Sequence, residues 1–384
     1  MARRDRSRIP ASRGLAAALA VALAALLAAA PARADETIAT VAAPGPISSY
    51  GGVTAWSALD PATGRFRLTV AGPSGVRTLP IRGRAVPFDV DLGRGARGGV
   101  VAAYSRCRRE PRRQTLGNAL IAHPGWSTAT GCRLWSYSFA TGRETRIAHT
   151  AVRGASEFLP TVWEGRVAFA RRYPARAGLR GERAYLYVRD GSRTRALPPG
   201  TRSAYRVCIG GNCHRQRLVV EPGPTALDLR GHRLALAWDS GSRTGPTSSI
   251  YVETIGRRTV ERRRLEAVES GDIQGLELVS PAIDGSSVFW GSLRFGDETR
   301  SELRRRALPS GPLAVATIPP DGAYLRPVLA FAVDAGRVTY LVSGAPSAAE
   351  PGCTPETPCV ADPGCTAGRP CEIRVAQGLE FRRP

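Results

Sequence analysis

The sequence has 384 residues, of which 43% are hydrophobic and 22% charged, so it can bury a large core and is not a disordered tail. All 54 basic residues are arginine, which excludes chemistry that needs a lysine side chain, such as Schiff-base formation. With four histidines and one methionine the composition does not favour a multi-histidine metal centre, and we expect neither a metal nor a cofactor. The formal net charge of +22 favours anionic partners.

The first 34 residues have the pattern of an export signal. A group of arginines within residues 3–13 precedes an Ala/Leu/Val stretch over residues 15–30, and Ala32 and Ala34 supply the small residues of a cleavage site. The apolar stretch is shorter than the roughly 20 residues that a membrane-spanning helix needs. We therefore predict a signal peptide over residues 1–34, a secreted or extracytoplasmic location, and no transmembrane segment in the mature chain.

A unit with two landmarks recurs six times in the rest of the chain. The first landmark is a glycine turn leading into a run that is apolar on both faces, as expected of a strand packed between two sheets. These runs lie at residues 53–56, 100–104, 167–170, 234–238, 288–290 and 338–342. The second landmark is a β-hairpin with a glycine turn, whose first strand lies at residues 66–70, 135–139, 185–188, 250–255, 303–308 and 373–375.

A further short strand precedes most units, which gives four strands per unit, named a, b, c and d in chain order. Six such units can bury their apolar faces only against one another, which predicts an all-β fold: a six-bladed β-propeller of four-stranded antiparallel blades. A β-sandwich is the alternative, but it does not need six copies of one pattern. We predict a single propeller domain over residues 45–384, preceded by an N-terminal arm over residues 35–44.

The units resemble the TolB-type, WD-like propeller repeats of bacterial envelope proteins. The family's Pro-Asp-Gly turn before an apolar strand is echoed by the segment from Asp284 to Trp290, and its Ile-Tyr strand by Ile250 to Val252. This resemblance covers the whole predicted propeller and implies a protein of the cell envelope. It carries no activity with it, because repeats indicate a fold rather than a function.

The long insertions of the sequence fall on one end of the predicted propeller. Strands alternate in direction, so a–b and c–d turns share one end, the turn face, while b–c and d–a connections share the other, the long-loop face. The long connections all belong to the second group and lie at residues 105–132, 171–184, 198–223, 239–249 and 343–371. Because binding residues are often carried on loops of a rigid scaffold, we expect the functional surface on the long-loop face.

Much of the arginine excess falls in these insertions. Guanidinium groups pair with phosphate, sulfate or carboxylate, so the candidate anion-binding residues are Arg106, Arg108, Arg109, Arg112, Arg113, Arg171 and Arg172. The alternative is that these arginines have no ligand and only keep exposed loops hydrated. The partner we expect is an anionic polymer or another envelope protein; we expect no nucleic acid for an exported protein, and a monomer.

Eight cysteines in an exported protein predict four disulfides. Cys107 and Cys132 bracket one long loop, and Cys208 and Cys213 can close a small loop. The last four lie in a duplicated C-x5-C segment, which favours pairing Cys353 with Cys359 and Cys365 with Cys371, while a nested pairing of the same four stays open. A zinc site at Cys208, Cys213 and His214 is the competing interpretation, but no fourth ligand lies nearby.

Acidic residues recur near the end of strand a in five of the six units, at Asp89, Asp91, Glu164, Asp228, Asp284 and Asp334. Since strand a lines the tunnel of a propeller, these carboxylates could form a ring at one tunnel mouth that holds a cation or acts as acid and base. The alternative is that an aspartate beside a glycine bonds the backbone of a tight turn.

Known catalytic motifs do not add a stronger candidate. Residues 93–98 spell G-x-G-x-x-G after a strand, but a strand rather than a helix is expected to follow, so we interpret them as a turn. No G-x-S-x-G or H-E-x-x-H occurs. We therefore expect a non-enzymatic binding propeller with no assigned catalytic residue, the alternative being a polysaccharide lyase or hydrolase that works through the tunnel-mouth carboxylates.

Overall fold

The computed structural model of the chain describes residues 35–110, 129–173, 183–197, 205–209, 212–216, 223–241, 246–257, 259–269, 276–294, 300–318, 324–344, 359–360, 365–366, 368–377 and 379–384.

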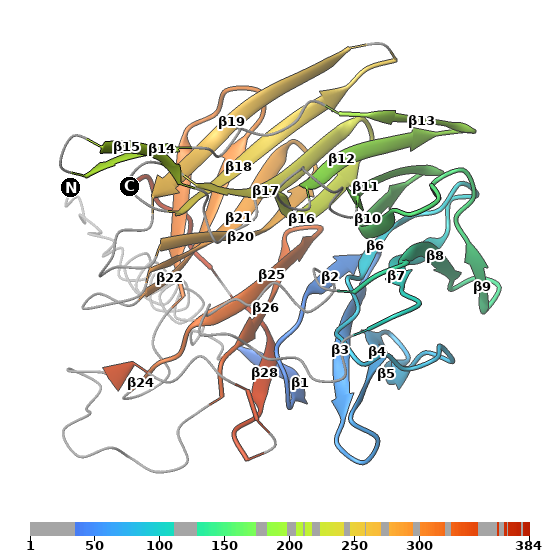
Figure 1. Cartoon of the computed structure of the whole chain (residues 1–384). Helices are drawn as coiled ribbons and strands as arrows, with labels where there is room; N and C mark the ends of the chain where they lie inside the picture. Colours follow the sequence, from blue (N-terminus) through green and yellow to red (C-terminus); the bar gives the residue numbers. More distant parts are fainter. Residues whose placement is uncertain are drawn as a thin grey trace, which may run out of the picture.

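Six four-stranded antiparallel sheets form the blades of a β-propeller, which confirms the predicted fold (Figure 1). Blade 1 contains β2 (Ile47–Tyr50), β3 (Val53–Asp60), β4 (Arg65–Gly72) and β5 (Gly75–Thr78). Blade 2 contains β6 (Asp91–Arg94), β7 (Val100–Arg106), β8 (Arg133–Ser138) and β9 (Arg143–Arg146). Blade 3 contains β10 (Ser156–Trp163), β11 (Arg166–Tyr173), β12 (Arg183–Asp190) and β13 (Arg193–Ala196).

The other three blades complete the circle. Blade 4 contains β16 (Gly223–Arg230), β17 (Arg233–Gly241), β18 (Pro246–Ile255) and β19 (Val260–Glu269). Blade 5 contains β20 (Leu276–Asp284), β21 (Ser287–Arg294), β22 (Arg300–Ala307) and β23 (Leu313–Thr317). Blade 6 contains β25 (Val328–Asp334), β26 (Arg337–Val342), β28 (Cys371–Val375) and, as its outer strand, β1 (Glu36–Val41).

The first strand of each blade is the innermost, and these six strands contact one another in a closed circle around the axis. Six apolar clusters fill the six interfaces between neighbouring blades. The interface between blades 3 and 4, for example, joins Ala168 and Leu186 to Leu229 and Leu236, all of them buried. The b strands are apolar on both faces because each face packs against a different neighbour.

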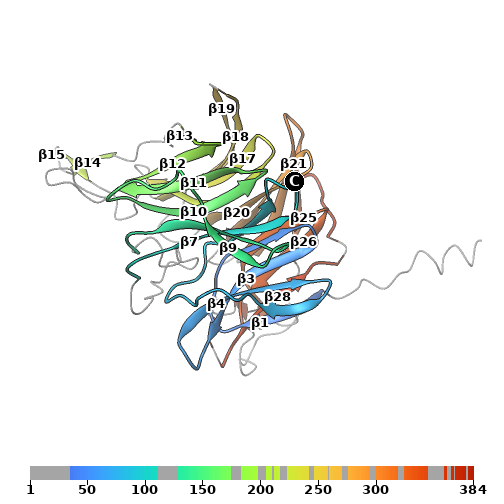
Figure 2. The same cartoon turned by 90° about the vertical axis from the view of Figure 1, so that its right-hand side faces the viewer.

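The N-terminal segment closes the ring. We expected residues 35–44 as an arm outside the propeller, but Glu36–Val41 forms β1, which pairs antiparallel with β28 from the other end of the chain (Figure 2). The hairpin pattern had predicted that residues after 375 form the outer strand of blade 6. That strand comes instead from the N-terminus. The C-terminal residues run instead to blade 5, where Arg382 bridges Val315 of β23.

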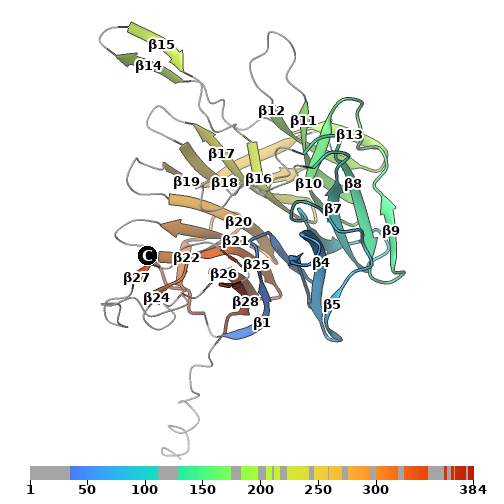
Figure 3. The same cartoon turned by 60° about the horizontal axis from the view of Figure 1, so that its bottom comes forward.

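Two small sheets lie outside the blades. The hairpin of β14 (Tyr205–Ile209) and β15 (Asn212–Gln216) stands away from the disc between blades 3 and 4 (Figure 3). The short strands β24 (Tyr324–Leu325) and β27 (Cys359–Val360) pair in parallel beside blade 6. Both belong to connections that the sequence placed on the long-loop face.

Candidate functional site: an arginine-lined groove on the long-loop face

A groove of about 750 Å³ lies on the long-loop face where blade 2 meets blade 3. Its walls come from the ends of β7 and β9, the start of β8, the connection over residues 153–156 and the end of β11. Among the described residues six arginines line it and no carboxylate does. The lining arginines are Arg106, Arg108, Arg133, Arg146, Arg153 and Arg172.

Two of these arginines, Arg106 and Arg133, build the walls of the groove. Arg106 pairs with Glu144 at 2.8 Å and lies over the ring of Trp135, 5.0 Å from its centroid. Arg133 pairs with Glu157 at 2.7 Å and also donates to the carbonyl oxygen of Ala155 at 2.7 Å. These guanidinium groups join strands and connections that are distant in the sequence, and they fix the shape of the groove.

Three further lining arginines are exposed to solvent. Arg108, Arg146 and Arg153 are exposed, and within the described residues no ion pair or hydrogen bond of their guanidinium groups is present. Glu144 and Glu157 adjoin the groove, but each already faces an arginine of its own. Within the part of the chain that the structure describes, the groove therefore has an excess of positive charge and no acidic side chain in its lining.

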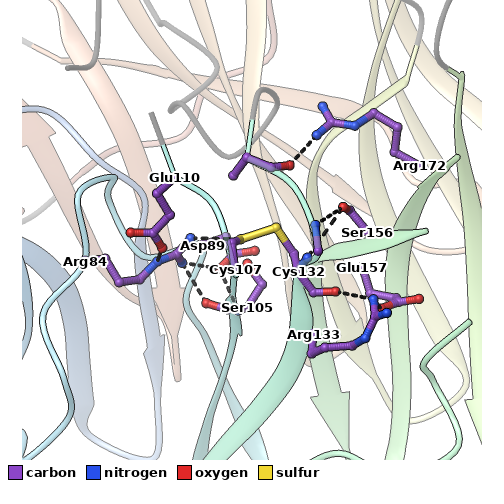
Figure 4. Close-up of a disulfide and its surroundings, with 12 residues drawn as sticks. Arg84, Asp89, Ser105, Cys107, Glu110, Cys132, Arg133, Ser156, Glu157 and Arg172 are labelled. Carbon is purple, nitrogen blue, oxygen red and sulfur yellow. Dashed lines mark hydrogen bonds and ion pairs between the residues drawn. A yellow bond between two sulfur atoms is a disulfide. The ribbon is translucent and has the colours of Figure 1, made fainter. Parts of the chain in front are cut away.

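A disulfide and a buried ion cluster hold the base of the groove (Figure 4). Cys107 and Cys132 are joined at an S–S distance of 2.06 Å and tie the end of β7 to the start of β8. Beside them the buried Arg84 contacts Glu110 at 2.8 Å and Asp89 at 3.3 Å, and it donates to the carbonyl oxygen of Ser105 at 2.7 Å. A buried charge needs such complete pairing, so the loop that carries Arg108 begins from a rigid base.

The structure places the predicted anion-binding residues in different environments. Arg106 and Arg108 line the groove, and Arg109 is exposed next to them. Arg171 and Arg172 are only 4% and 6% exposed: Arg171 lies 3.4 Å from Glu157 and against the ring of Tyr187, and Arg172 donates to the carbonyl oxygen of Ala129. Arg171 is therefore a buried residue of the interior. Arg172 lies at the groove floor, where its guanidinium group is engaged by the Ala129 carbonyl oxygen. Arg112 and Arg113 lie outside the described residues.

Sequence reasoning missed Arg146 and Arg153. Neither lies in a long insertion: Arg146 ends the outer strand β9, and Arg153 lies in the connection that leads into blade 3. The available signal was the strand order itself, because the end of strand d and the d–a connection also lie on the long-loop face.

The remaining cysteines follow the expected pairs where the structure describes them. Cys365 and Cys371 are joined, which excludes the nested pairing of the last four cysteines. Cys208 and Cys213 are directly opposite each other in the β14–β15 register, and their side chains lie outside the description. Cys359 lies in β27, whereas Cys353 is outside the described residues.

The predicted carboxylate ring is not a convergent site. Each blade offers a side-chain oxygen near the axis that accepts a backbone N–H of the next blade, and the six bonds run once around the ring. Four of the acceptors are predicted carboxylates. The bonds are Leu92 N–H to Ser48, Val162 N–H to Asp91, Leu229 N–H to Thr161, Ile283 N–H to Asp228, Gly336 N–H to Asp284 and Gly52 N–H to Asp334.

The two other predicted carboxylates are also engaged. The buried Asp89 accepts the N–H groups of Ser105 and Leu159, each at 2.8 Å, and so ties blade 2 to blade 3. Glu164 is exposed and pairs with Arg94 at 3.1 Å. Asp284 and Asp334 each accept a backbone N–H group of a tight turn, and that turn belongs to the neighbouring blade.

Side chains from three blades meet at the turn-face end of the tunnel. Arg230 lies 4.5 Å from the ring centroid of Tyr50 and 5.3 Å from that of Trp163, and donates to the carbonyl oxygen of Ser49 across the axis. The tunnel cavity has a volume of about 80 Å³, far below the roughly 300 Å³ of the smallest common ligand sites. This geometry does not favour a lyase or hydrolase acting on a sugar chain inside the tunnel.

Burial changes the titration of two tunnel carboxylates. It raises the pKa of Asp91 to about 7, with the nearby Asp228 raising it further and Arg230 opposing the shift. Burial also raises the pKa of Asp228, again opposed by Arg230. Both carboxyls accept inter-blade hydrogen bonds, so these shifted groups have a structural role in the ring.

Other candidate sites are weaker. Within the described ranges no group of three or more His, Cys, Asp or Glu side chains could hold a metal ion. The G-x-G-x-x-G segment ends β6 and forms the turn into β7. A Cβ on Gly93 would lie 1.9 Å from the carbonyl oxygen of Val162, so a glycine is needed there for the close approach of blades 2 and 3.

Among the described residues no helix is long and apolar enough to cross a membrane.

No protein-family model and no curated protein matches the sequence. Solved structures of similar fold do exist. The chain is similar to TolB from Acinetobacter baumannii. The two are 13% identical, with a TM-score of 0.43, over 98% of this chain and 73% of TolB.

Two further solved structures are similar at the same level. The β-propeller domain of the Trilobed protease from Pyrococcus furiosus is 12% identical, with a TM-score of 0.42, over 87% of this chain and 78% of that domain. The polysaccharide lyase Uly1 is 9% identical, with a TM-score of 0.38, over 81% of this chain and 69% of the lyase. Similarity at this level says nothing about the ligand or activity of this chain, which depend on its own site residues.

Proposed function

We propose that the chain is an exported, non-enzymatic binding propeller that holds an anionic partner of the cell envelope on its long-loop face. The observation that carries the proposal is the groove between blades 2 and 3, whose described lining has six arginines and no carboxylate. Guanidinium groups without counter-charges attract carboxylate, phosphate or sulfate groups. Export is supported by the pattern of residues 1–34 and by the two described disulfides, since such bonds persist in oxidising compartments.

Retention on an immobilised anionic polymer at low ionic strength tests this proposal. Because a chain of this net charge binds any anionic resin to some degree, the comparison must be between faces of the same protein. Changing Arg108 and Arg109 to Glu should lower the salt concentration needed for elution, since both are exposed on the long-loop face.

The matched control changes Arg143 and Arg193 to Glu, two exposed arginines at c–d turns of the turn face. Both double variants lose the same charge, so a purely global effect would move both elution points equally. Equal shifts, or retention of the wild type no stronger than on a neutral resin, would refute the proposed binding face.

A further inference from the structure

We propose that the groove binds a segment of an acidic polysaccharide, a sugar chain with carboxylate or sulfate groups, and that Arg108, Arg146 and Arg153 make the ionic contacts. This inference rests on the proposed function and gives its site a ligand class and a residue set. Two of the three arginines, Arg146 and Arg153, lie outside the insertions that first pointed to this face.

These three arginines differ from the other lining arginines in whether the guanidinium group is already paired. Arg106 and Arg133 are already paired with Glu144 and Glu157, so a ligand anion would have to compete with a carboxylate at either position. Arg108, Arg146 and Arg153 are exposed and have no such competitor in the described part of the chain. They come from three different segments, so an anionic group bound to each would lie along the groove rather than at one point.

The size of the groove favours a chain over a single anion. Its volume of about 750 Å³ is that of a site for a drug-sized ligand, whereas a lone phosphate or sulfate would leave most of it to water. Small and hydroxyl-bearing residues, among them Thr130, Gly131, Gly154 and Ser156, form much of the remaining wall. Such a wall leaves room for sugar rings and offers partners for their hydroxyl groups.

Two other polyanions fit this groove less well. Single-stranded nucleic acid is held by stacking of its bases on open aromatic rings. In the described lining the one aromatic ring is that of Trp135, and Arg106 covers it. A bilayer surface would call for apolar side chains that insert beside the basic ones. Among the described residues Val152 is the one large exposed apolar side chain next to the groove, and the groove itself is concave.

The test measures binding of defined oligosaccharides to the folded full-length mature protein by titration calorimetry. The probes are an oligogalacturonate, a sulfated heparin oligosaccharide and a neutral dextran oligosaccharide of similar length. We expect one or both acidic probes to bind and the neutral one not to bind. Changing Arg146 and Arg153 to Ala should weaken the binding at least about tenfold, because two charge-assisted contacts are lost.

A control variant with Arg143 and Arg193 changed to Ala has the same net charge and should change the affinity less than about twofold, as expected of screened distant charges. Which acidic probe binds better identifies carboxylate or sulfate as the preferred group. The inference is wrong if both variants weaken binding equally, if a galacturonate monomer binds as tightly as the oligomer, or if single-stranded DNA or anionic lipid vesicles bind in preference to both acidic oligosaccharides. Retention on the long-loop face together with any of these results would leave the proposed function standing.

Discussion

At the scale of single residues, polar groups near the axis explain how the blades stay in register. Ser48, Asp91, Thr161 and Asp228 occupy the same place on four inner strands, and each accepts an N–H group from the next blade. Blades 5 and 6 have alanines at that place, Ala282 and Ala332, and bond through the turn residues Asp284 and Asp334 instead. The ring therefore uses the same physical device with different residues, which is why the acids looked like a functional pattern.

The buried Asp91 predicts a pH dependence of stability. Its pKa is about 7 in the folded state against an ordinary value of 3.8, so the fold prefers the protonated carboxyl. Its stabilising contribution is complete below about pH 4 and is lost as the pH rises through 7. The charged groups that face it are Asp228, which disfavours the carboxylate, and Arg230, which favours it.

Changing Asp91 to Asn should remove this dependence, since the amide can keep the bonds to Val162 and Ser48 without a charge. We expect the free energy of unfolding of the wild type to fall relative to the variant by roughly 3 to 4 kcal/mol between pH 4 and pH 8. Urea unfolding across this range measures the difference. The exposed Asp190 changed to Asn is the control and should follow the wild type; parallel curves for all three proteins would contradict the assignment.

At the scale of elements, the N-terminal strand β1 is the part on which ring closure depends. It pairs with β28, and Val41 packs with Cys371 and Ile373 at the interface between blades 6 and 1. The Asp35 carboxylate accepts the Gln377 N–H at 2.9 Å and the Tyr340 hydroxyl group. Since β1 and β28 lie at opposite ends of the chain, this pairing carries the largest loop-closure cost in the fold.

Cutting the chain after β1 tests this role. A protease site inserted within residues 42–46 and cleaved in the folded protein should leave the β1 peptide bound, and its removal at moderate denaturant should lower the melting temperature by several degrees. The same site inserted in the β3–β4 turn, over residues 61–64, is the control, because both flanking strands stay anchored in blade 1 after cleavage. An unchanged melting temperature after loss of the peptide would show that β1 is dispensable.

At the scale of the whole molecule, a rigid disc carries cross-linked connections on one face. The two described disulfides lie at long connections, and the facing positions of Cys208 and Cys213 suit a third. Disulfides contribute about 2 to 4 kcal/mol each, mainly by restricting the unfolded chain, which suits connections with little apolar surface to bury.

This arrangement predicts no free thiol in the mature protein. Titration of the denatured, unreduced protein should find none of the eight cysteines reactive, and reduction should expose all eight. Two or more reactive thiols before reduction would contradict the prediction for Cys208 with Cys213 or for Cys353 with Cys359. Peptide mapping under non-reducing conditions would then identify the unpaired residues.

The local pattern of the chain determined the six-bladed architecture, the two-faced burial of the b strands and the face on which the insertions lie. These follow from alternation and turn residues, which act over a few residues and can be read along the sequence. Three features depended on the tertiary structure: β1 as the outer strand of blade 6, the bonding of Asp284 and Asp334 to neighbouring blades, and the meeting of Arg108, Arg146 and Arg153 around one groove. Each joins residues that are distant in the sequence, and their proximity arises only when the ring closes and sets one blade against the next.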